Sequence, residues 1–163
     1  ELLIDIKQDI LKIAVVERHT GNGKVTVGLV NGFGFTENCG IATTVAHDSH
    51  QMIVVGTNEE DMAIAANELA KINGGQIVVK NGEIIGFVDL PIAGLMSNER
   101  AEIVADKART VLDGFIKCGC NLNNPNMQLS LLALVVIPEL RISDLGLVDV
   151  NEFKFIPVID QNI

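Results

Sequence analysis

The sequence predicts an α+β fold in which helices pack on one side of a mixed, largely antiparallel sheet. Its apolar runs are mostly short and rich in β-branched residues, so predicted strands outnumber predicted helices. Several strands are paired through short turns containing Asn and Gly, which favours hairpins over parallel crossover units. No internal repeat or linker divides the 163 residues, so we expect a single domain over residues 1–163.

Four strands are expected in the first third of the chain. Residues 11–19 form an apolar, β-branched run, and the turn residues at 20–23 reverse the chain into a second strand at 24–30. Two further apolar runs, 41–47 and 52–57, predict strands on either side of a short polar insert.

The middle of the chain predicts a helix and a second hairpin. Residues 57–60 (Thr-Asn-Glu-Glu) have the pattern of a capping box, in which the Thr hydroxyl accepts from the amide three residues on. Apolar residues then recur at helical spacing until Gly74, which predicts an amphipathic helix. Residues 76–80 and 83–90 predict two strands, joined by an Asn-Gly pair at 81–82 that is a strong hairpin signal.

A second amphipathic helix is expected after these strands. Ser97 or Asn98 is its predicted N-cap, and Gly119 is its predicted end. Its apolar stripe consists of Ala101, Val104, Ala108, Val111, Leu112 and Phe115.

The C-terminal third has weaker patterns. Residues 121–126 predict a polar loop, and the apolar run 127–137 leaves helix and strand open because periodicity does not separate them. Residues 139–150 predict irregular structure, and residues 153–158 predict a short last strand.

Composition predicts a large apolar surface that faces protein. Hydrophobic residues make up 48% of the chain and the mean hydropathy is +0.34, which is high for an isolated soluble domain. The longest apolar run, residues 129–137, is well short of the ~20 residues of a membrane helix, so we expect no membrane partner. We therefore expect the surplus apolar surface to contact another domain or another subunit, and we expect a homo-oligomer.

Charge and cysteine content limit the possible binding partners and indicate the cellular compartment. The net charge of -9 argues against nucleic acid, whose binding depends mostly on Lys and Arg. The three cysteines are an odd number and no signal peptide opens the chain, so we expect reduced thiols and a cytoplasmic protein. The chain begins at Glu1 without Met, so we expect it to have been processed or cut from something longer.

The polar insert between the predicted strands 41–47 and 52–57 has the highest density of side chains that could take part in catalysis. His47, Asp48, Ser49 and His50 follow one another directly, and each can give or take a proton. If they continued a strand, alternation would place them on opposite faces, whereas a turn would let them converge at the end of the sheet. A proton shuttle at such a place and a loop that satisfies its own backbone both remain open interpretations.

A glycine-rich stretch at residues 31–35 suggests a phosphate-binding loop. Neither complete phosphate-loop motif is present, and no helical pattern follows. We therefore expect a glycine-jointed loop from which Phe33 and Phe35 pack inward.

A metal site would need more ligands than the local sequence offers. His47 and His50 are spaced so that both could bind one metal ion. The sequence has no second cluster of carboxylates and histidines, and His19 is remote in sequence. Cys118 and Cys120 lack the second pair of a zinc site. We therefore expect no metal bound by this chain.

Longer motifs resemble one known family. Residues 45–63 (VAHDSHQMIVVGTNEEDMA) resemble the signature of the C-terminal domain of adenine deaminases. Residues 90–97 (LPIAGLMS) and 136–140 (VIPEL), together with 144–150, resemble the same family in the same order. One departure is Gln51, where the family usually has Asn.

This resemblance implies a two-part enzyme of the metal-dependent amidohydrolase superfamily, active in adenine catabolism and purine salvage. A metal-binding barrel, absent from this chain and expected upstream of it, would hold manganese or iron. There a metal-activated water would attack C6 of adenine and yield hypoxanthine and ammonia. This chain would then be inactive alone.

In such an enzyme, the candidate site residues are His47, Asp48, Ser49 and His50, for substrate contact or proton transfer at the interface with the barrel. Two other functions remain open. The chain would otherwise be a non-catalytic scaffold or oligomerisation domain, or a small-molecule binding module that uses the loop containing Gly32 and Gly34.

Overall fold

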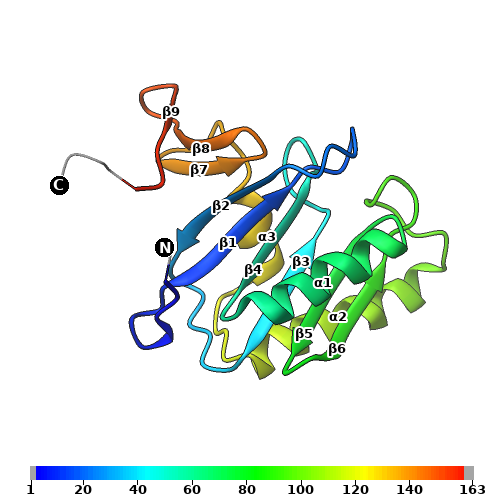
Figure 1. The fold of residues 1–163 in the computed structure, drawn as a ribbon. Helices are drawn as coiled ribbons and strands as arrows, with labels where there is room; N and C mark the ends of the chain where they lie inside the picture. Colours follow the sequence, from blue (N-terminus) through cyan, green and yellow to red (C-terminus); the bar gives the residue numbers. More distant parts are fainter. Residues whose placement is uncertain (1–2, 160–163) are drawn as a thin grey trace.

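The fold is built on one antiparallel sheet (Figure 1). The computed structural model describes residues 3–159, and its main sheet has six strands in the order β2-β1-β4-β3-β5-β6. Every neighbouring pair is antiparallel, so the predicted α+β class is confirmed and the sheet is antiparallel throughout. The strands are β1 (Leu11–Val16), β2 (Val25–Val30), β3 (Cys39–Thr43), β4 (Met52–Gly56), β5 (Gly75–Lys80) and β6 (Glu83–Asp89).

Helices cover both faces of this sheet, so the prediction that they pack on one side is wrong. They are α1 (Glu59–Lys71), α2 (Ala101–Lys117) and α3 (Pro125–Leu131), with a short 3-10 helix at Ile6–Gln8. Val54 packs in one cluster with Met62 of α1, whereas Val55 packs in another with Val111 of α2. Every residue of β3 and β4 is buried, and strands that are apolar on both sides need cover on both sides.

The C-terminal part forms a second antiparallel sheet, so the prediction of irregular structure at 139–150 is wrong. Its strands are β7 (Leu140–Ser143), β8 (Gly146–Asp149) and β9 (Lys154–Ile156), and β9 confirms the predicted last strand. Ser143 Oγ accepts from the amides of Leu145 and Gly146 at 3.2 and 3.3 Å, which closes the first hairpin. Four-residue strands are too short to show a clear alternation of apolar and polar residues.

The ambiguous apolar run is partly helical. Helix α3 occupies Pro125–Leu131, and residues 132–139 form turns and bends. The predicted loop at 121–126 therefore ends two residues early, because Pro125 is the first helical residue. Proline is favoured there, since the first helical amide needs no intrahelical acceptor.

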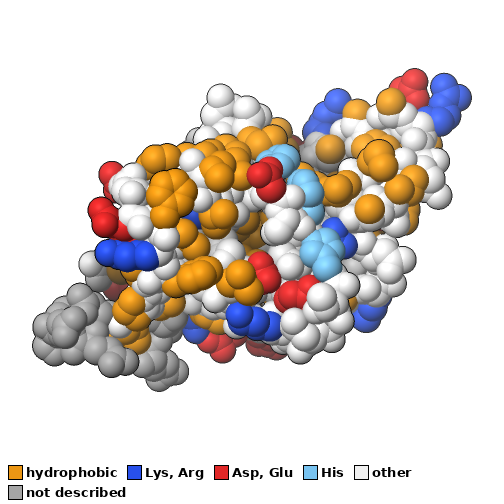
Figure 2. Space-filling view, turned by 90° about the horizontal axis from the view of Figure 1, so that it is seen from above, with side chains coloured by type: hydrophobic (Ala, Val, Ile, Leu, Met, Phe, Trp, Pro, Cys, Tyr) orange, Lys and Arg blue, Asp and Glu red, His pale blue; other side chains and the backbone are white. Residues whose placement is uncertain are grey.

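Large apolar side chains also remain on the surface, as the composition predicted. Figure 2 looks down on the upper end of the Figure 1 view and shows hydrophobic side chains gathered beside the histidines. Within residues 3–159, no helix combines the length and the hydropathy needed to cross a membrane.

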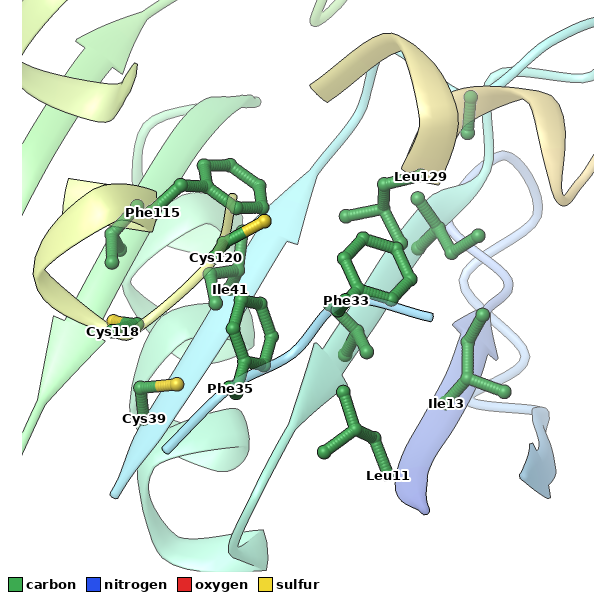
Figure 3. Close-up of a cluster of buried hydrophobic side chains, with 14 of the residues drawn as sticks. Leu11, Ile13, Phe33, Phe35, Cys39, Ile41, Phe115, Cys118, Cys120 and Leu129 are labelled. Atoms are coloured by element: carbon green, nitrogen blue, oxygen red, sulfur yellow. The ribbon is translucent and has the colours of Figure 1, made fainter. Parts of the chain in front are cut away.

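The main core lies between the sheet and helices α2 and α3 (Figure 3). Phe35 is central to it, with ring centroids 5.5 Å from Phe33 and 6.1 Å from Phe115. The three cysteines lie in the same cluster as free, buried thiols. The prediction that Phe33 and Phe35 pack inward is confirmed, since they are 3% and 1% exposed.

The glycine loop uses its amides within the chain. The Asp9 carboxylate accepts from the backbone N–H of Gly32 at 2.7 Å and of Gly34 at 2.9 Å. A phosphate would therefore have to displace a carboxylate that already holds the loop.

Both predicted helix caps are wrong in detail. Asn58, not Thr57, caps α1 by accepting from the Asp61 amide at 2.8 Å, while the Thr57 hydroxyl accepts from the Cys39 amide at 2.7 Å. Helix α2 begins after Arg100 rather than after Ser97 or Asn98, and Arg100 makes no side-chain capping bond within the described residues. Thr57 lies beside β3 in space, and a local pattern does not contain that competing partner.

Gly40 tests the packing of α1 on β3. A Cβ added at Gly40 would lie 2.3 Å from backbone atoms of Asp61 and Met62. We expect Gly40→Ala to lower the free energy of unfolding by about 3 kcal/mol, because neither backbone can move aside cheaply. At Gly28 the nearest atoms are side-chain carbons at 3.5 Å, so Gly28→Ala is the control and should cost less than about 1 kcal/mol. Equal losses in denaturant unfolding would contradict this packing.

Candidate functional site

Three loops meet where β1 and β3 end and β4 begins. Arg18 and His19 follow β1, residues 44–51 connect β3 to β4, and Ala93 follows β6. These loops bring together His19, His47 and His50, which we call the histidine cluster. They are all of the histidines in the chain, and Figure 2 shows them at this end of the sheet.

The connection between β3 and β4 is a turn rather than a continued strand. β3 ends at Thr43, four residues before the predicted end at residue 47. The His50 amide donates to the Ala46 carbonyl at 2.7 Å, and His50 Nδ1 accepts from the Ala46 amide at 3.3 Å. The interpretation in which the polar insert turns rather than continuing the strand is therefore confirmed.

The turn presents its four polar side chains to different degrees. His47 and His50 are half-buried with ring centroids 5.1 Å apart, while Asp48 and Ser49 are exposed. The His47 amide donates to Ser130 Oγ of α3 at 3.2 Å, which fixes the turn on that side. The segment is thus open to the outside.

Arg18 holds the turn from the other side. Its Nε donates to the His50 carbonyl at 2.6 Å, and its Nη2 donates to the Ala93 carbonyl at 2.7 Å. Its backbone amide donates to Gln51 Oε1 at 2.9 Å, so the glutamine that departs from the family pattern has a structural partner. No ion pair to Arg18 is found in residues 3–159, so its guanidinium acts on backbone carbonyls.

His19 completes the cluster, although it is remote from the other two histidines in sequence. Its Nε2 lies 2.6 Å from the Ser49 carbonyl oxygen. Glu17 shapes the turn that carries His19 by accepting from the backbone amides of His19 and Thr20 at 2.7 and 2.8 Å. These hydrogen bonds, that of the Thr20 amide foremost, lower the pKa of Glu17 to about 2. The pairing of β1 with β4 brings His19 beside the 44–51 connection, and no local sequence motif indicates this.

His50 is electrostatically suited to remain neutral. Burial lowers its pKa below the ordinary 6.5, and the nearby His47 and Arg18 lower it further. Because Nδ1 accepts the Ala46 amide, the neutral ring carries its proton on Nε2. In this tautomer the ring can donate a hydrogen bond from Nε2, while Nδ1 is engaged by the Ala46 amide.

The residues of the turn do not form a metal site. Across residues 3–159, no group of three or more His, Cys, Asp or Glu side chains is placed to hold a metal ion. Cys118 and Cys120 are buried free thiols.

A pocket of about 520 Å³ lies between the turn and the second sheet. Asp48 and Ser49 form its polar side, together with Ser143 and Asp144. Its apolar side is formed by Ala133, Leu134, Val135, Leu145, Val148, Phe153 and Phe155. Sequence reasoning missed this pocket, because the second sheet that builds it was not predicted.

Replacing Arg18 tests whether it holds the turn. We expect Arg18→Met to lower the free energy of unfolding by about 1–3 kcal/mol, since two carbonyls lose charge-assisted partners while the apolar stem is kept. Amides of residues 47–50 should also exchange faster with solvent. Arg109→Met is the control, because within residues 3–159 Arg109 pairs only with exposed Asp106. This substitution should cost less than about 0.5 kcal/mol. Unchanged exchange in Arg18→Met would refute the assigned role.

The titration of His50 tests the electrostatics. Its ring signals in an NMR titration should have a midpoint below 6.5, and Arg18→Met should raise that midpoint by removing a nearby cation. The pKa of His50 is higher in the unfolded chain than in the folded one. The contribution of His50 to the free energy of unfolding is therefore fully present above about pH 6.5 and is lost as the pH falls toward the folded pKa. The ring signals of His50 are identified as those missing from the spectrum of His50→Ala. A midpoint above 6.5 would exclude the arrangement described.

Comparison with known proteins agrees with the motifs. Residues 1–154 match the sequence model of the family described as adenine deaminase C-terminal domain. The chain is 55% identical over 156 residues to adenine deaminase 3 of Rhizobium meliloti, covering 96% of this chain and 26% of that protein. It is 58% identical over 152 residues to adenine deaminase of Roseobacter denitrificans, covering 93% and 25%.

A more distant relative gives the same result. Adenine deaminase of Moorella thermoacetica is 46% identical over 154 residues, covering 94% of this chain and 26% of that protein. The chain thus spans about a quarter of the length of the curated relatives it matches. The match over nearly all of its own length shows that the chain belongs to the adenine deaminase C-terminal domain family.

Proposed function

We propose that this chain is the C-terminal part of a hydrolase that deaminates adenine, and that residues 47–50 lie at the edge of its substrate site. Family membership supports the activity, because the relatives are named adenine deaminases. The observation that carries the placement is the open turn, in which Asp48 and Ser49 are exposed beside a pocket.

The reaction needs groups that move protons. Water adds at C6 of adenine, the bond from C6 to the amino nitrogen breaks, and hypoxanthine and ammonia are formed. The amino nitrogen must gain a proton before it leaves, and a positioned side chain contributes typically 10²–10⁴-fold to such a step. At this turn the Asp48 carboxylate can take a proton from the attacking water and give it to the amino nitrogen. His50, whose Nδ1 is engaged by the Ala46 amide, can donate a hydrogen bond from Nε2.

The metal of such an enzyme belongs, in this proposal, to the preceding part of the polypeptide. Manganese or iron held there would supply the activated water. Within residues 3–159 no group of three or more ligand side chains is placed to hold a metal ion, so this proposal gives these residues roles in binding and proton transfer.

The proposal also covers the cellular setting. Three buried, unpaired thiols agree with a reducing compartment such as the cytoplasm, where the enzyme would serve adenine catabolism and purine salvage. The large exposed apolar side chains support assembly, which includes the homo-oligomer expected from composition.

A scaffold role is the second candidate, and one observation favours it. His19 Nε2 and His50 Nδ1 both engage backbone groups, so much of the histidine cluster serves to hold the turn. A small-molecule module built on the Gly32 and Gly34 loop has less support, because Asp9 occupies both amides.

Asp48→Asn and His50→Ala in the full-length enzyme separate the two candidates. The Asp48 carboxylate has no hydrogen-bond partner in the described part of the chain, so its replacement should leave folding intact. We expect turnover of adenine, followed by ammonia release, to fall by about 10²-fold or more in Asp48→Asn if it moves a proton. His50→Ala should also reduce turnover, and thermal melting shows how much of that loss comes from the turn.

Asp113→Asn on the exposed side of α2 is the matched control and should retain full activity. The isolated 163-residue chain should release no ammonia. Wild-type turnover in both Asp48→Asn and His50→Ala would reject the substrate-site placement in favour of a scaffold. Ammonia release by the isolated chain would contradict the proposal that the metal site lies in the preceding part of the polypeptide.

A further inference from the structure

One apolar face of the molecule is too exposed to be left in water. Phe153, Phe155 and Leu145 are 84%, 60% and 65% exposed, and Val135 beside them is 37% exposed. Single exposed apolar residues are ordinary, whereas a contiguous group of large ones marks a contact surface. These four side chains line one pocket, so they form one contiguous surface, which we call the apolar face.

The apolar face is continuous with the turn of the candidate site. Asp48 and Ser49 line the same pocket as Phe153 and Phe155, and Figure 2 shows hydrophobic side chains reaching the histidines. Whatever covers the apolar face must therefore also approach the 47–50 turn.

The charges around the apolar face indicate which chemical groups its partner must present. Asp48 and Asp144 lie at its rim with Lys154, and neither carboxylate has a hydrogen bond or ion pair inside the 3–159 range. Covering these carboxylates removes water from them, which is costly unless the partner supplies N–H donors or cations. A second copy would add another charge of -9 instead.

We infer that the apolar face, with Asp48 and Ser49 at its rim, docks onto the metal-binding part of the longer polypeptide to which this chain belongs. This inference rests on the proposed function and names the partner of the same site. The chain covers about a quarter of its relatives, so a body roughly three times its size is available as the occupant. That body presents an apolar surface with basic or N–H donor groups opposite Asp48 and Asp144.

Photo-cross-linking in the full-length enzyme tests this docking. A p-benzoylphenylalanine residue replaces Leu145 in one variant and Ile84 in the control, since Ile84 is 50% exposed on β6 at the far edge of the main sheet. After irradiation, the variant at position 145 should form a cross-link to a peptide from outside these 163 residues. The control should not form that cross-link.

Three outcomes would overturn the docking: no cross-link at position 145, a cross-link to residues 1–163 of a second copy, or equal cross-linking at positions 145 and 84. Adenine turnover, measured before irradiation, tests the proposed function separately. An active enzyme without the expected cross-link would reject only the docking. If the cross-link forms in the position-145 variant but the wild-type enzyme does not deaminate adenine, only the activity would be rejected.

Discussion

The burial of β3 and β4 on both faces is the constraint from which the site follows. All ten residues of the two strands are buried, because α1 covers one side of the sheet and α2 and α3 cover the other. Polar residues cannot be inserted within such strands without losing their hydration. The polar segment between them must therefore leave at the end of the sheet and turn there, which brings His47 to His50 to an open surface.

Backbone satisfaction explains why this turn is ordered rather than loose. Carbonyl and amide groups that leave a sheet need other partners, and here long-range side chains provide them. Arg18 from the end of β1 binds the carbonyl of His50, and Ser130 from α3 binds the amide of His47. The order of strands in the sheet, with β1 beside β4, is what brings Arg18 within reach.

Much of the main sheet could be predicted from sequence, because its signals are local. The Asn81-Gly82 pair fixes the β5 to β6 hairpin, and helical spacing after residue 58 predicts α1. The two-sided covering of the sheet was not predictable from the two helical stripes, since a stripe shows that a helix is buried but not on which face of the sheet. Of the second sheet the sequence predicts only the last strand, because β7 and β8 have four residues each and show no clear alternation.

The candidate site was predictable only where its residues are neighbours in sequence. The polar run from His47 to His50 stands out between two apolar strands, whereas His19 and Arg18 reach the site through strand pairing. The pocket beside the turn depends on Leu145, in a segment predicted to be irregular, and on Phe153 and Phe155, in the predicted last strand, whose partner strands were not predicted. Long-range pairing, rather than residue type, decided which polar groups met.

A prearranged turn also bears on how the chain would act on a partner. The amides of His47 and His50 and the carbonyls of Ser49 and His50 all have partners within the chain, so the turn needs no ligand to become ordered. Binding to a preorganised surface loses less conformational entropy than binding to a loop that must fold on contact. The side chains of Asp48 and Ser49 remain exposed on this fixed backbone. Their positions are therefore set by the fold of this chain, and a docking partner would meet polar groups already held in place.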